Sequence, residues 1–397
     1  MLERDTEPVR SIRRAIEQRG PISFAEFMEL ALYGARGFYE RPPVGERGHF
    51  VTSPHVHPVF ADLLADGIRA CWHALGRPDP LRLVEVGAGD GTLATQLRRA
   101  LADVPKRYVV VERSTGARQA LRRLQPPVQV AASLESIGQR LDGVVVANEL
   151  LDNLPFRWVR RHVHGDVHEV RVDVADGDFV SVDRPVDGDD EELVDAIPPL
   201  APGADGPVPV GALHLVERLA RVLHCGYALF IDYEAGPASE IHGYRGQRPV
   251  EDVLSEPGTA DITAGVDFRV LSGRAEALGL RSFPRVSQRS ALTALGYDRW
   301  ARHELGRQAE AQTTRSGREA VLAWSGRNAA ALLVDPAGLG RFRWWLLATP
   351  GLPPPPWFVV ASRKELEDMA AVPSHPDEGV MWSEDRRTRR GWVRRRH

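Results

Sequence analysis

The chain has 397 residues, of which 43% are hydrophobic, and a formal net charge of −3 at pH 7. It is long enough to bury a sizeable core in one large domain or two moderate ones, and its balanced charge argues against nucleic acid or a membrane surface as the main partner. No apolar run is long enough to span a bilayer, and the charged N-terminus lacks the pattern of a targeting peptide. We therefore expect a cytoplasmic protein, and the composition does not predict its oligomeric state.

The cysteines and histidines do not indicate a metal centre. Cys71 and Cys225 fall in apolar stretches, where a small buried thiol is the usual role. His55 and His57 lie close together, but no second pair follows at the interval that a metal site requires. We therefore predict no metal ligand.

Residues 1–77 are predicted to form an N-terminal helical cap. The apolar spacing predicts helices over residues 7–19, 24–33 and 56–75. Ser23 is followed by Glu26 three residues later, which is typical of a capping box at the start of the second helix. A loop rich in Gly, Pro and Arg separates the second helix from the third.

Residues 78–350 are predicted to form the main domain, because strands and helices alternate there. The strands are expected over 81–86, 108–111, 128–131, 144–147 and 227–231. The helices between them are expected over 92–101, 116–124 and 212–223. Such alternation predicts an α/β fold with a Rossmann-like, doubly wound parallel sheet that carries helices on both faces.

Two segments of this domain depart from the alternation. An insertion at about 156–210 is expected to contain an antiparallel meander and then an exposed, mobile loop over 186–209. A helical substrate region is expected at about 240–326, and strand material near 330–334. The antiparallel strands are predicted over 158–163, 167–172 and 179–182, and the later helices over 267–278 and 298–324. Residues 363–397 are charged, with a strongly basic end, and are predicted to form a disordered tail of undetermined role.

A glycine loop follows the first strand of the α/β pattern. Glu85 lies near the end of that strand, and Gly87, Gly89 and Gly91 form a Gly-x-Gly-x-Gly loop before a helix. Glycine permits positive φ and close approach of a ligand, and a helix N-terminus suits a carboxylate. A dinucleotide fingerprint would have its third glycine where Thr92 stands, so the loop favours S-adenosylmethionine (SAM) over NAD. Glu85 is expected to meet the ammonium of its methionine moiety or to order water around it.

Two further strand ends carry polar residues. Glu112, at the end of the second strand, is expected to accept hydrogen bonds from the ribose hydroxyls, with a helix-capping or surface role as the alternative. Asn148, Glu149 and Asp152 follow the fourth strand, where the ligands of open α/β sheets lie. Glu149 and Asp152 are candidates to hold a cationic acceptor such as guanidinium and to take up a proton, although turn formation would also explain Asp152.

An ordered series of motifs resembles the SAM-dependent methyltransferase family of the mitochondrial complex I assembly factor that methylates a protein arginine, with its bacterial, MidA-like homologues. The resemblance covers most of the chain from Gly20 to about Gly296. Its motifs are Gly20-Pro21-Ile22-Ser23-Phe24, Phe50-Val51-Thr52-Ser53-Pro54, Glu85 to Gly91, Glu112-Arg113-Ser114, Asn148-Glu149 through Pro155, Ile231-Asp232-Tyr233, Tyr244-Arg245 and Asp261-Ile262-Thr263.

The resemblance implies a SAM cofactor on a class I methyltransferase sheet. It implies that the loop with Thr52 and Ser53 closes over the cofactor site, and it adds Arg113 and Ser114 to the cofactor-binding candidates. It also makes Asp232 a lesser catalytic candidate. The substrate that it implies is a protein arginine.

Three functions follow from these observations. The first is a methyltransferase that acts on a nitrogen, such as that of a protein arginine, with Glu149 holding the acceptor. The second is an assembly or interaction protein that keeps the fold and cofactor without catalysis. Four departures from the family pattern favour that reading: histidines replace acids at His49 and His55, and Gln247 and Gly265 replace histidines. The third is a small-molecule methyltransferase.

Overall fold

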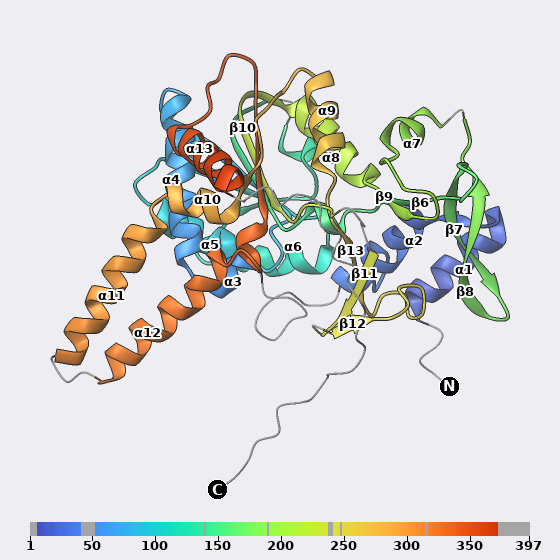
Figure 1. The fold of residues 1–397 in the computed structure, drawn as a ribbon, viewed down its shortest axis with the longest axis horizontal. Helices are drawn as coiled ribbons and strands as arrows, with labels where there is room; N and C mark the ends of the chain where they lie inside the picture. Colours follow the sequence, from blue (N-terminus) through green and yellow to red (C-terminus); the bar gives the residue numbers. More distant parts are fainter. Residues whose placement is uncertain are drawn as a thin grey trace, which may run out of the picture.

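The structure is a computed structural model that describes residues 6–40, 52–138, 140–188, 190–236, 241–246, 248–313 and 317–371 (Figure 1). His49, Gln247 and the part of the predicted tail beyond residue 371 lie outside the described residues. No described helix is both long enough and apolar enough to cross a membrane.

A mixed sheet of eight strands lies at the centre of the fold, in the order β14-β16-β10-β5-β2-β3-β4, with β15 also paired to β16. The strands that run parallel are β4 (Gln129–Ala131), β3 (Lys106–Val111), β2 (Leu81–Val86), β5 (Leu141–Asn148) and β10 (Leu223–Asp232). The antiparallel ones are β16 (Arg343–Ala348), β14 (Arg281–Ser282) and β15 (Val286–Ser287). The five parallel strands are those that the sequence predicts.

Helices cover both faces of this sheet because its strands are apolar on both sides. On β2, Leu83 belongs to the core cluster that includes residues of α4, α5, α10 and α13, whereas Val84, on the other face, belongs to the cluster that includes residues of α8 and α9. The first group is α4 (Val59–Ala74), α5 (Thr92–Ala100), α10 (Gln288–Ala294) and α13 (Pro356–Ala371). The second is α8 (Val210–Val222) and α9 (Phe268–Ala277), and α6 (Thr115–Leu121) follows β3. The predicted doubly wound α/β fold is confirmed.

The N-terminal segment begins with α1 (Glu7–Arg19), which has the predicted bounds. The Ser23 hydroxyl accepts a hydrogen bond from the N–H of Glu26 (3.2 Å), as the predicted cap requires. The predicted helix over 24–33 is an α-helix in its first half and a π-helix in its second half. The predicted helix over 56–75 is interrupted at Pro58, which cannot donate a backbone hydrogen bond. The remaining elements are β1 (Ile22–Ser23), α2 (Phe24–Met28), the π-helix η1 (Glu29–Tyr33), η2 (Phe38–Glu40) and α3 (Ser53–Val56).

The inserted segment contains the predicted antiparallel strands and joins the N-terminal segment in one sheet. Its strands are β6 (Arg157–Arg161), β7 (Val167–Ala175), β8 (Asp178–Pro185) and β9 (Asp205–Val208), and β1 pairs with β7. The prediction of a mobile loop over 186–209 is wrong. Helix α7 (Glu191–Ala196) forms there, because Asp190 caps it and Leu193 packs into the core.

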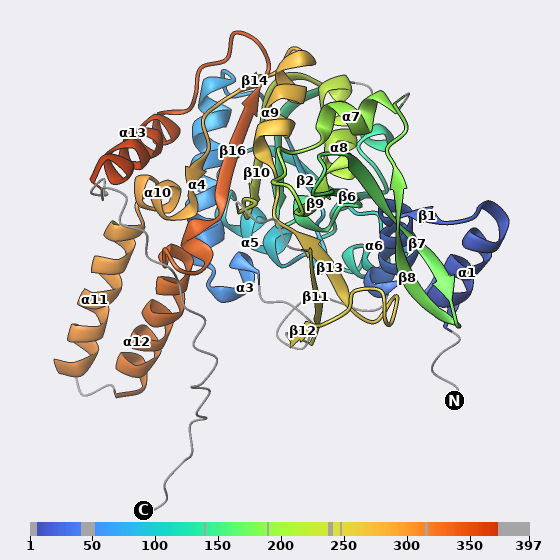
Figure 2. The same ribbon diagram turned by 45° about the vertical axis from the view of Figure 1, so that its right-hand side comes forward.

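The C-terminal part departs most from the prediction. A three-stranded sheet of β11 (Ile241–Arg245), β12 (Arg248–Val250) and β13 (Asp261–Ala264) lies within the segment expected to be helical. The single helix expected over 298–324 is a projecting hairpin of α11 (Tyr297–Thr313) and α12 (Gly317–Ala331) (Figures 1 and 2). Residues 332–334 form the short helix η5 rather than a strand, and η6 (Leu339–Arg341) follows.

The predicted disordered tail begins too early in the chain. Residues 363–371 belong to helix α13, whose Trp357, Phe358 and Ala361 pack into the core. Glu365 of the same helix accepts hydrogen bonds from Ser287 and Ser290, which fixes its second half. Charge density alone therefore misplaced this boundary.

Candidate active site

The carboxyl ends of β2, β3 and β5 open into a cavity of about 1130 Å³, which the N-terminal segment and β13 also line. Nine of the predicted site residues line it: Thr52, Glu85, Gly87, Gly89, Glu112, Arg113, Asn148, Glu149 and Asp152. The other four, Ser53, Gly91, Ser114 and Asp232, do not. The fold therefore brings residues from distant parts of the sequence to one place, as the predicted strand ends require.

The glycine loop is the floor of the cavity. Gly89 has a φ of 54°, and a Cβ atom built on it would meet nothing within 4 Å, so the space in front of it is open. Gly91 has a φ of 81°, but a Cβ there would lie 2.7 Å from Leu124. Gly91 therefore serves the turn into α5, and its predicted contact with the cofactor is not supported by its position.

Glu112 is held at the end of β3 by backbone N–H groups. Its Oε2 accepts from Gly89 (3.0 Å) and its Oε1 from Ser114 (2.8 Å). Burial raises the pKa of Glu112, and these two hydrogen bonds oppose the rise. The carboxylate thus bridges the glycine loop and the next strand end, and each oxygen keeps a further lone pair for a ligand.

The two residues after Glu112 have different surroundings. The guanidinium of Arg113 lies 3.8 Å from the ring centroid of Tyr33 and pairs with Glu29 at the edge of the cavity. Ser114 is buried, caps α6 through the N–H of Ala117 (3.1 Å) and donates its hydroxyl to a carbonyl oxygen. The prediction of Ser114 as a cofactor ligand is therefore corrected: both partners of its hydroxyl are backbone groups.

Glu85 lies at the base of the cavity and is only 3% exposed. Burial raises its pKa to about 8, although a hydrogen bond from the Tyr108 hydroxyl opposes that rise. The burial of this carboxyl therefore disfavours its charged form.

Glu149 has a left-handed backbone, with a φ of 52°, directly after β5. Its Oε1 accepts hydrogen bonds from the N–H of Ser53 (2.8 Å) and the side-chain amide of Asn148 (3.1 Å). Burial raises the pKa of Glu149 to about 7, and both hydrogen bonds act against the increase. One oxygen is therefore fixed to the protein, in a group that can gain or lose a proton near neutral pH.

A second acidic group faces the same cavity from η4 (Leu151–Asn153). Asp152 Oδ2 accepts from the Thr263 hydroxyl (2.8 Å), which also bonds the hydroxyl of Tyr233. Asp152 Oδ1 is buried and has no hydrogen-bond partner among the described atoms. Burial raises the pKa of Asp152 to about 6.

Sequence reasoning assigned no site role to Asp261, Thr263 or Tyr39. Asp261 Oδ1 accepts from the Tyr39 hydroxyl (2.7 Å) and Oδ2 from the side-chain amide of Asn153 (3.2 Å). Burial raises the pKa of Asp261 to about 8. The signal was present in the sequence, because two polar residues separated by one position lie on the same face of a strand.

Asp232 does not line the cavity. It is fully buried, and its Oδ2 accepts from the N–H groups of Leu150 (3.0 Å) and Leu151 (2.7 Å), while its Oδ1 accepts from that of Tyr233 (2.9 Å). The prediction of Asp232 as a catalytic residue is corrected: its carboxylate holds the turn that carries Asp152.

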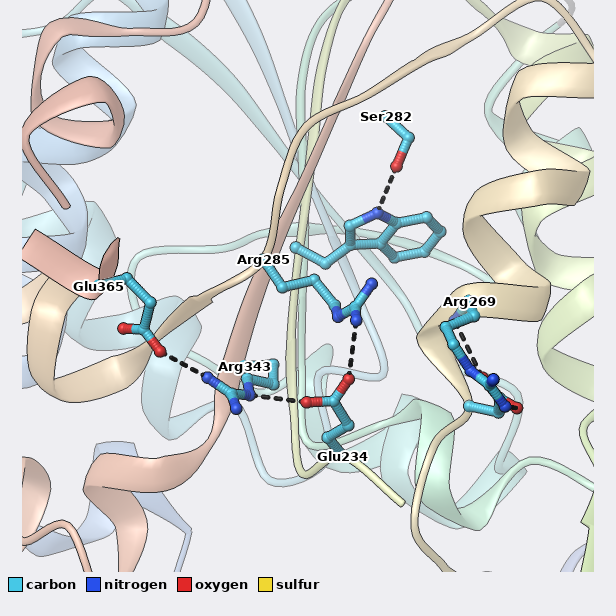
Figure 3. A network of polar contacts seen from close by, with 8 residues as sticks. Glu234, Arg269, Ser282, Arg285, Arg343 and Glu365 are labelled. Carbon is cyan, nitrogen blue, oxygen red and sulfur yellow. Dashed lines mark hydrogen bonds and ion pairs between the residues drawn. The ribbon is translucent and has the colours of Figure 1, made fainter. Parts of the chain in front are cut away.

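Beyond Tyr233, a network of ions fixes the end of β10 to the neighbouring elements. Glu234 pairs with Arg285 (2.9 Å) and Arg343 (2.8 Å), and Arg343 also pairs with Glu365 of α13 (2.7 Å). Figure 3 shows this chain of alternating charges between the elements. None of these four residues lines the cavity, so the network belongs to the structure next to Tyr233, which does line it.

The loop before α4 is tied to the glycine loop. His55 Nδ1 bonds the Thr52 hydroxyl (2.8 Å), and His55 Nε2 bonds Asp90 Oδ2 (2.9 Å). Burial alone would raise the pKa of Asp90, but the hydrogen bonds from His55 and Thr92 lower it overall. His55 therefore gives this loop a direct contact with the glycine loop, whereas Ser53 lies behind the wall and is fully buried.

Comparison with known proteins identifies the family. Residues 63–285, more than half of the chain, match the sequence model of the family described as "Putative S-adenosyl-L-methionine-dependent methyltransferase". The chain belongs to this methyltransferase family. Its fold is that of a class I methyltransferase, and its cofactor is SAM.

Three relatives illustrate the similarity. The chain is 28% identical to the mitochondrial protein arginine methyltransferase NDUFAF7 of Rattus norvegicus, over 74% of this chain and 75% of that one. It is 28% identical to NDUFAF7 of Homo sapiens, over 74% of each chain. A protein from Burkholderia thailandensis, described as a "COG1565 superfamily member and likely methyl transferase", has a crystal structure that holds S-adenosyl-homocysteine. It is 27% identical with a TM-score of 0.73, over 87% of this chain and 92% of that one.

These comparisons overturn one prediction from the sequence. The NDUFAF7 relatives of Rattus norvegicus and Homo sapiens and the homologue of Drosophila melanogaster are named as mitochondrial proteins, which contradicts the expected cytoplasmic location. The expectation rested on the charged N-terminus, which lacks the pattern of a targeting peptide. The lack of that pattern does not by itself indicate a location.

The cavity fits the cofactor of this family. Asn148 Oδ1 and Asp152 Oδ1 are buried acceptors without a partner among the described atoms, so a ligand with N–H or O–H groups would satisfy them. The open space before Gly89 gives such a ligand access to the backbone. Among the described residues, no group of three or more His, Cys, Asp or Glu could hold a metal ion.

Proposed function

We propose that this methyltransferase acts on a nitrogen of an arginine side chain in a protein. The observation that carries this proposal is the presence of two carboxyl groups, Glu149 and Asp152, on one cavity beside the glycine loop. Among the described residues, their partners are N–H and hydroxyl groups, and no basic side chain pairs with either. Both are therefore available to a cationic acceptor.

In this proposal the cofactor occupies the side of the cavity formed by Gly87, Gly89, Glu112 and Asn148. Glu112 would accept hydrogen bonds from the ribose hydroxyls, and the open backbone at Gly89 would admit the methionine moiety. When bound, SAM supplies a methyl group on a sulfonium, and the sulfur retains the electrons of the broken S–C bond.

The acceptor would lie between the glycine loop and β13. The free oxygen of Asp152 would orient a guanidinium so that one of its nitrogens faces the methyl group. As the new N–C bond forms, that nitrogen loses a proton, which the Glu149 carboxylate accepts and later passes to water. The methylated guanidinium keeps its single positive charge, so charge and atoms balance. A group with a pKa near 7 suits this exchange.

Two further observations bear on the acceptor: the first favours a protein, and the second concerns the space available to any acceptor. The relatives that match over about three quarters of their length are named protein arginine methyltransferases. The cavity, at about 1130 Å³, also exceeds the roughly 300–1,000 Å³ of ordinary small-ligand sites, so it has room for two ligands at once.

The experiment combines a binding measurement with a transfer measurement. S-adenosylhomocysteine should raise the melting temperature, and tritium from methyl-labelled SAM should enter proteins of an extract from cells that lack this chain, as methylarginine after acid hydrolysis. Label in small molecules alone would support the small-molecule alternative and contradict the proposal. A melting shift without any transfer would support the assembly-protein alternative, towards which His49 and His55 lean.

A further inference from the structure

A buried glutamine on α10 connects to Glu149 through one intermediate residue. Gln288 is fully buried, as are its neighbours Ser53 and Trp344. Its side chain does not line the cavity, and the methyl transfer proposed above does not use it. A polar amide at such a position costs free energy unless its hydrogen-bonding groups are satisfied, so its partners indicate why it is there.

Both ends of the Gln288 amide have partners from other segments. Oε1 lies 3.5 Å from the Ser53 hydroxyl and 3.4 Å from Trp344 Nε1, both of which donate to it. Nε2 donates to the carbonyl oxygen of Leu333, at 3.0 Å. The backbone is fixed as well, because the N–H of Gln288 donates to the carbonyl oxygen of Phe342 at 2.7 Å. This amide therefore has one orientation.

Ser53 connects the oriented amide of Gln288 to Glu149 in the site. The side chain of Ser53 faces Gln288, while its N–H donates to Glu149 Oε1 at 2.8 Å. The hydroxyl is the only part of Ser53 that Gln288 contacts through a hydrogen bond in the described structure. Ser53 is therefore the one buried residue that connects the Gln288 amide to Glu149.

The geometry points to Gln288 as a positioning residue, which fixes Ser53 so that its N–H holds one oxygen of Glu149 and leaves the other for the acceptor. This inference rests on the proposed role of Glu149 in transfer. The Ser53 N–H hydrogen bond also favours the charged form of Glu149, so losing it raises the pKa of that carboxyl.

Two variants test the connection. Gln288→Leu removes all three side-chain hydrogen bonds, whereas Ser53→Ala removes only the hydroxyl and leaves Gln288 bonded to Leu333 and Trp344. Leu292→Ala, at another fully buried position on α10, is the control for a general loss of packing. If Gln288→Leu does not fold, exchange of the residue-53 amide in Ser53→Ala decides. The pH profile of that variant alone does not, because the Ser53 hydroxyl also lowers the pKa of Glu149 directly.

The first readout is hydrogen exchange of the Ser53 amide, which requires no acceptor. We expect this amide to exchange at least tenfold faster in Gln288→Leu and in Ser53→Ala than in the wild type. In Leu292→Ala its protection relative to the other amides of the protein should be unchanged. Equal exchange in the wild type and both test variants would overturn the inference.

The second readout is the pH profile of methyl transfer into the extract proteins described above. In both test variants the rise of the transfer rate on the acidic side should occur at a pH about one unit higher. A hydrogen bond to a charged group changes its pKa by about that much. A lower rate without this shift in pH would show a structural role only and reject the inference. Glu149→Gln separates the two proposals: retained transfer in that variant would remove Glu149 as the proton acceptor, and the inference with it, but would leave the proposed function in place. Wild-type protein that forms no methylarginine would contradict the proposed function, while the exchange of the Ser53 amide would still test the contact with Gln288.

Discussion

Oε2 of Glu112 accepts a hydrogen bond from the N–H of Gly89 over 3.0 Å, so the proposed ribose ligand and the glycine loop form a single unit. The two residues are 23 positions apart, in the segments that follow the neighbouring parallel strands β2 and β3. A cofactor that contacts one of them must therefore lie against the other.

Gly89→Val should abolish cofactor binding, because its side chain would project into the open space before the loop. Wild-type protein at S-adenosylhomocysteine concentrations of about 100 times Kd should gain about 2.7 kcal/mol of stability, and the variant none. Calorimetry with and without ligand measures both. Gly279→Val is the matched control, since Gly279 also has positive φ and open space but lies on an exposed turn. A normal ligand shift in Gly89→Val would refute this placement of the cofactor.

Glu149→Gln should keep cofactor binding and lower the rate of methyl transfer by about 10²–10⁴, the usual contribution of a positioned proton acceptor. Wild-type transfer should rise with pH through about 7, as the carboxylate forms, and the variant should lose this limb. Initial rates between pH 5.5 and 9 check both expectations. The exposed Glu276→Gln serves as the control for the chemical change. A pH limb that persists in Glu149→Gln would assign the titration to another group.

Glu85→Gln should flatten the dependence of stability on pH. The folded-state pKa of Glu85, about 8, is above its ordinary value of 4.5, so the folded protein binds this proton more tightly than the unfolded chain does. The stability that Glu85 contributes is therefore full below pH 4.5 and falls as the pH rises towards 8, by up to about 1.4 kcal/mol per pH unit. Urea unfolding at pH 5, 6.5 and 8 measures the slope. An identical slope in wild type and variant would show that Glu85 is ionised throughout.

Asp232→Asn should destabilise the protein by about 2–3 kcal/mol, because an amide cannot accept N–H donors on both of its ends. Asp152→Asn should cost much less stability, since its Oδ1 has no partner to lose, but should reduce transfer. Denaturant unfolding and transfer rates for both variants separate the two roles. Equal losses of stability would mean that Asp152 is also part of the support for the turn.

The parallel strands and the glycine loop could be predicted because each is a local pattern. The apolar run of β2 and the glycines behind it specify strand, turn and helix without any distant contact. The predicted site residues meet because the carboxyl ends of parallel strands share one edge of a sheet, which is a property of the fold class.

The errors occurred where tertiary contacts decide the structure. Helix α7 has only six residues, and it depends on the burial of Leu193 and on a cap from Asp190. The β11–β13 sheet pairs short strands whose partners cannot be seen in any one of them. The roles of Asp232 and Ser114 also required coordinates, because a carboxylate or hydroxyl that binds backbone N–H groups has the same sequence signature as one that binds a ligand.

The backbone of Glu149 carries a further consequence. A non-glycine residue in the left-handed region costs on the order of 1–2 kcal/mol, so Glu149→Gly would relieve strain while it removes the proposed proton acceptor. Selection of variants for heat resistance alone would favour that loss if the relief of strain exceeds the cost of leaving the N–H of Ser53 without its acceptor. Directed evolution of this protein therefore needs a screen for turnover at every round, because the most heat-resistant variants would include inactive ones.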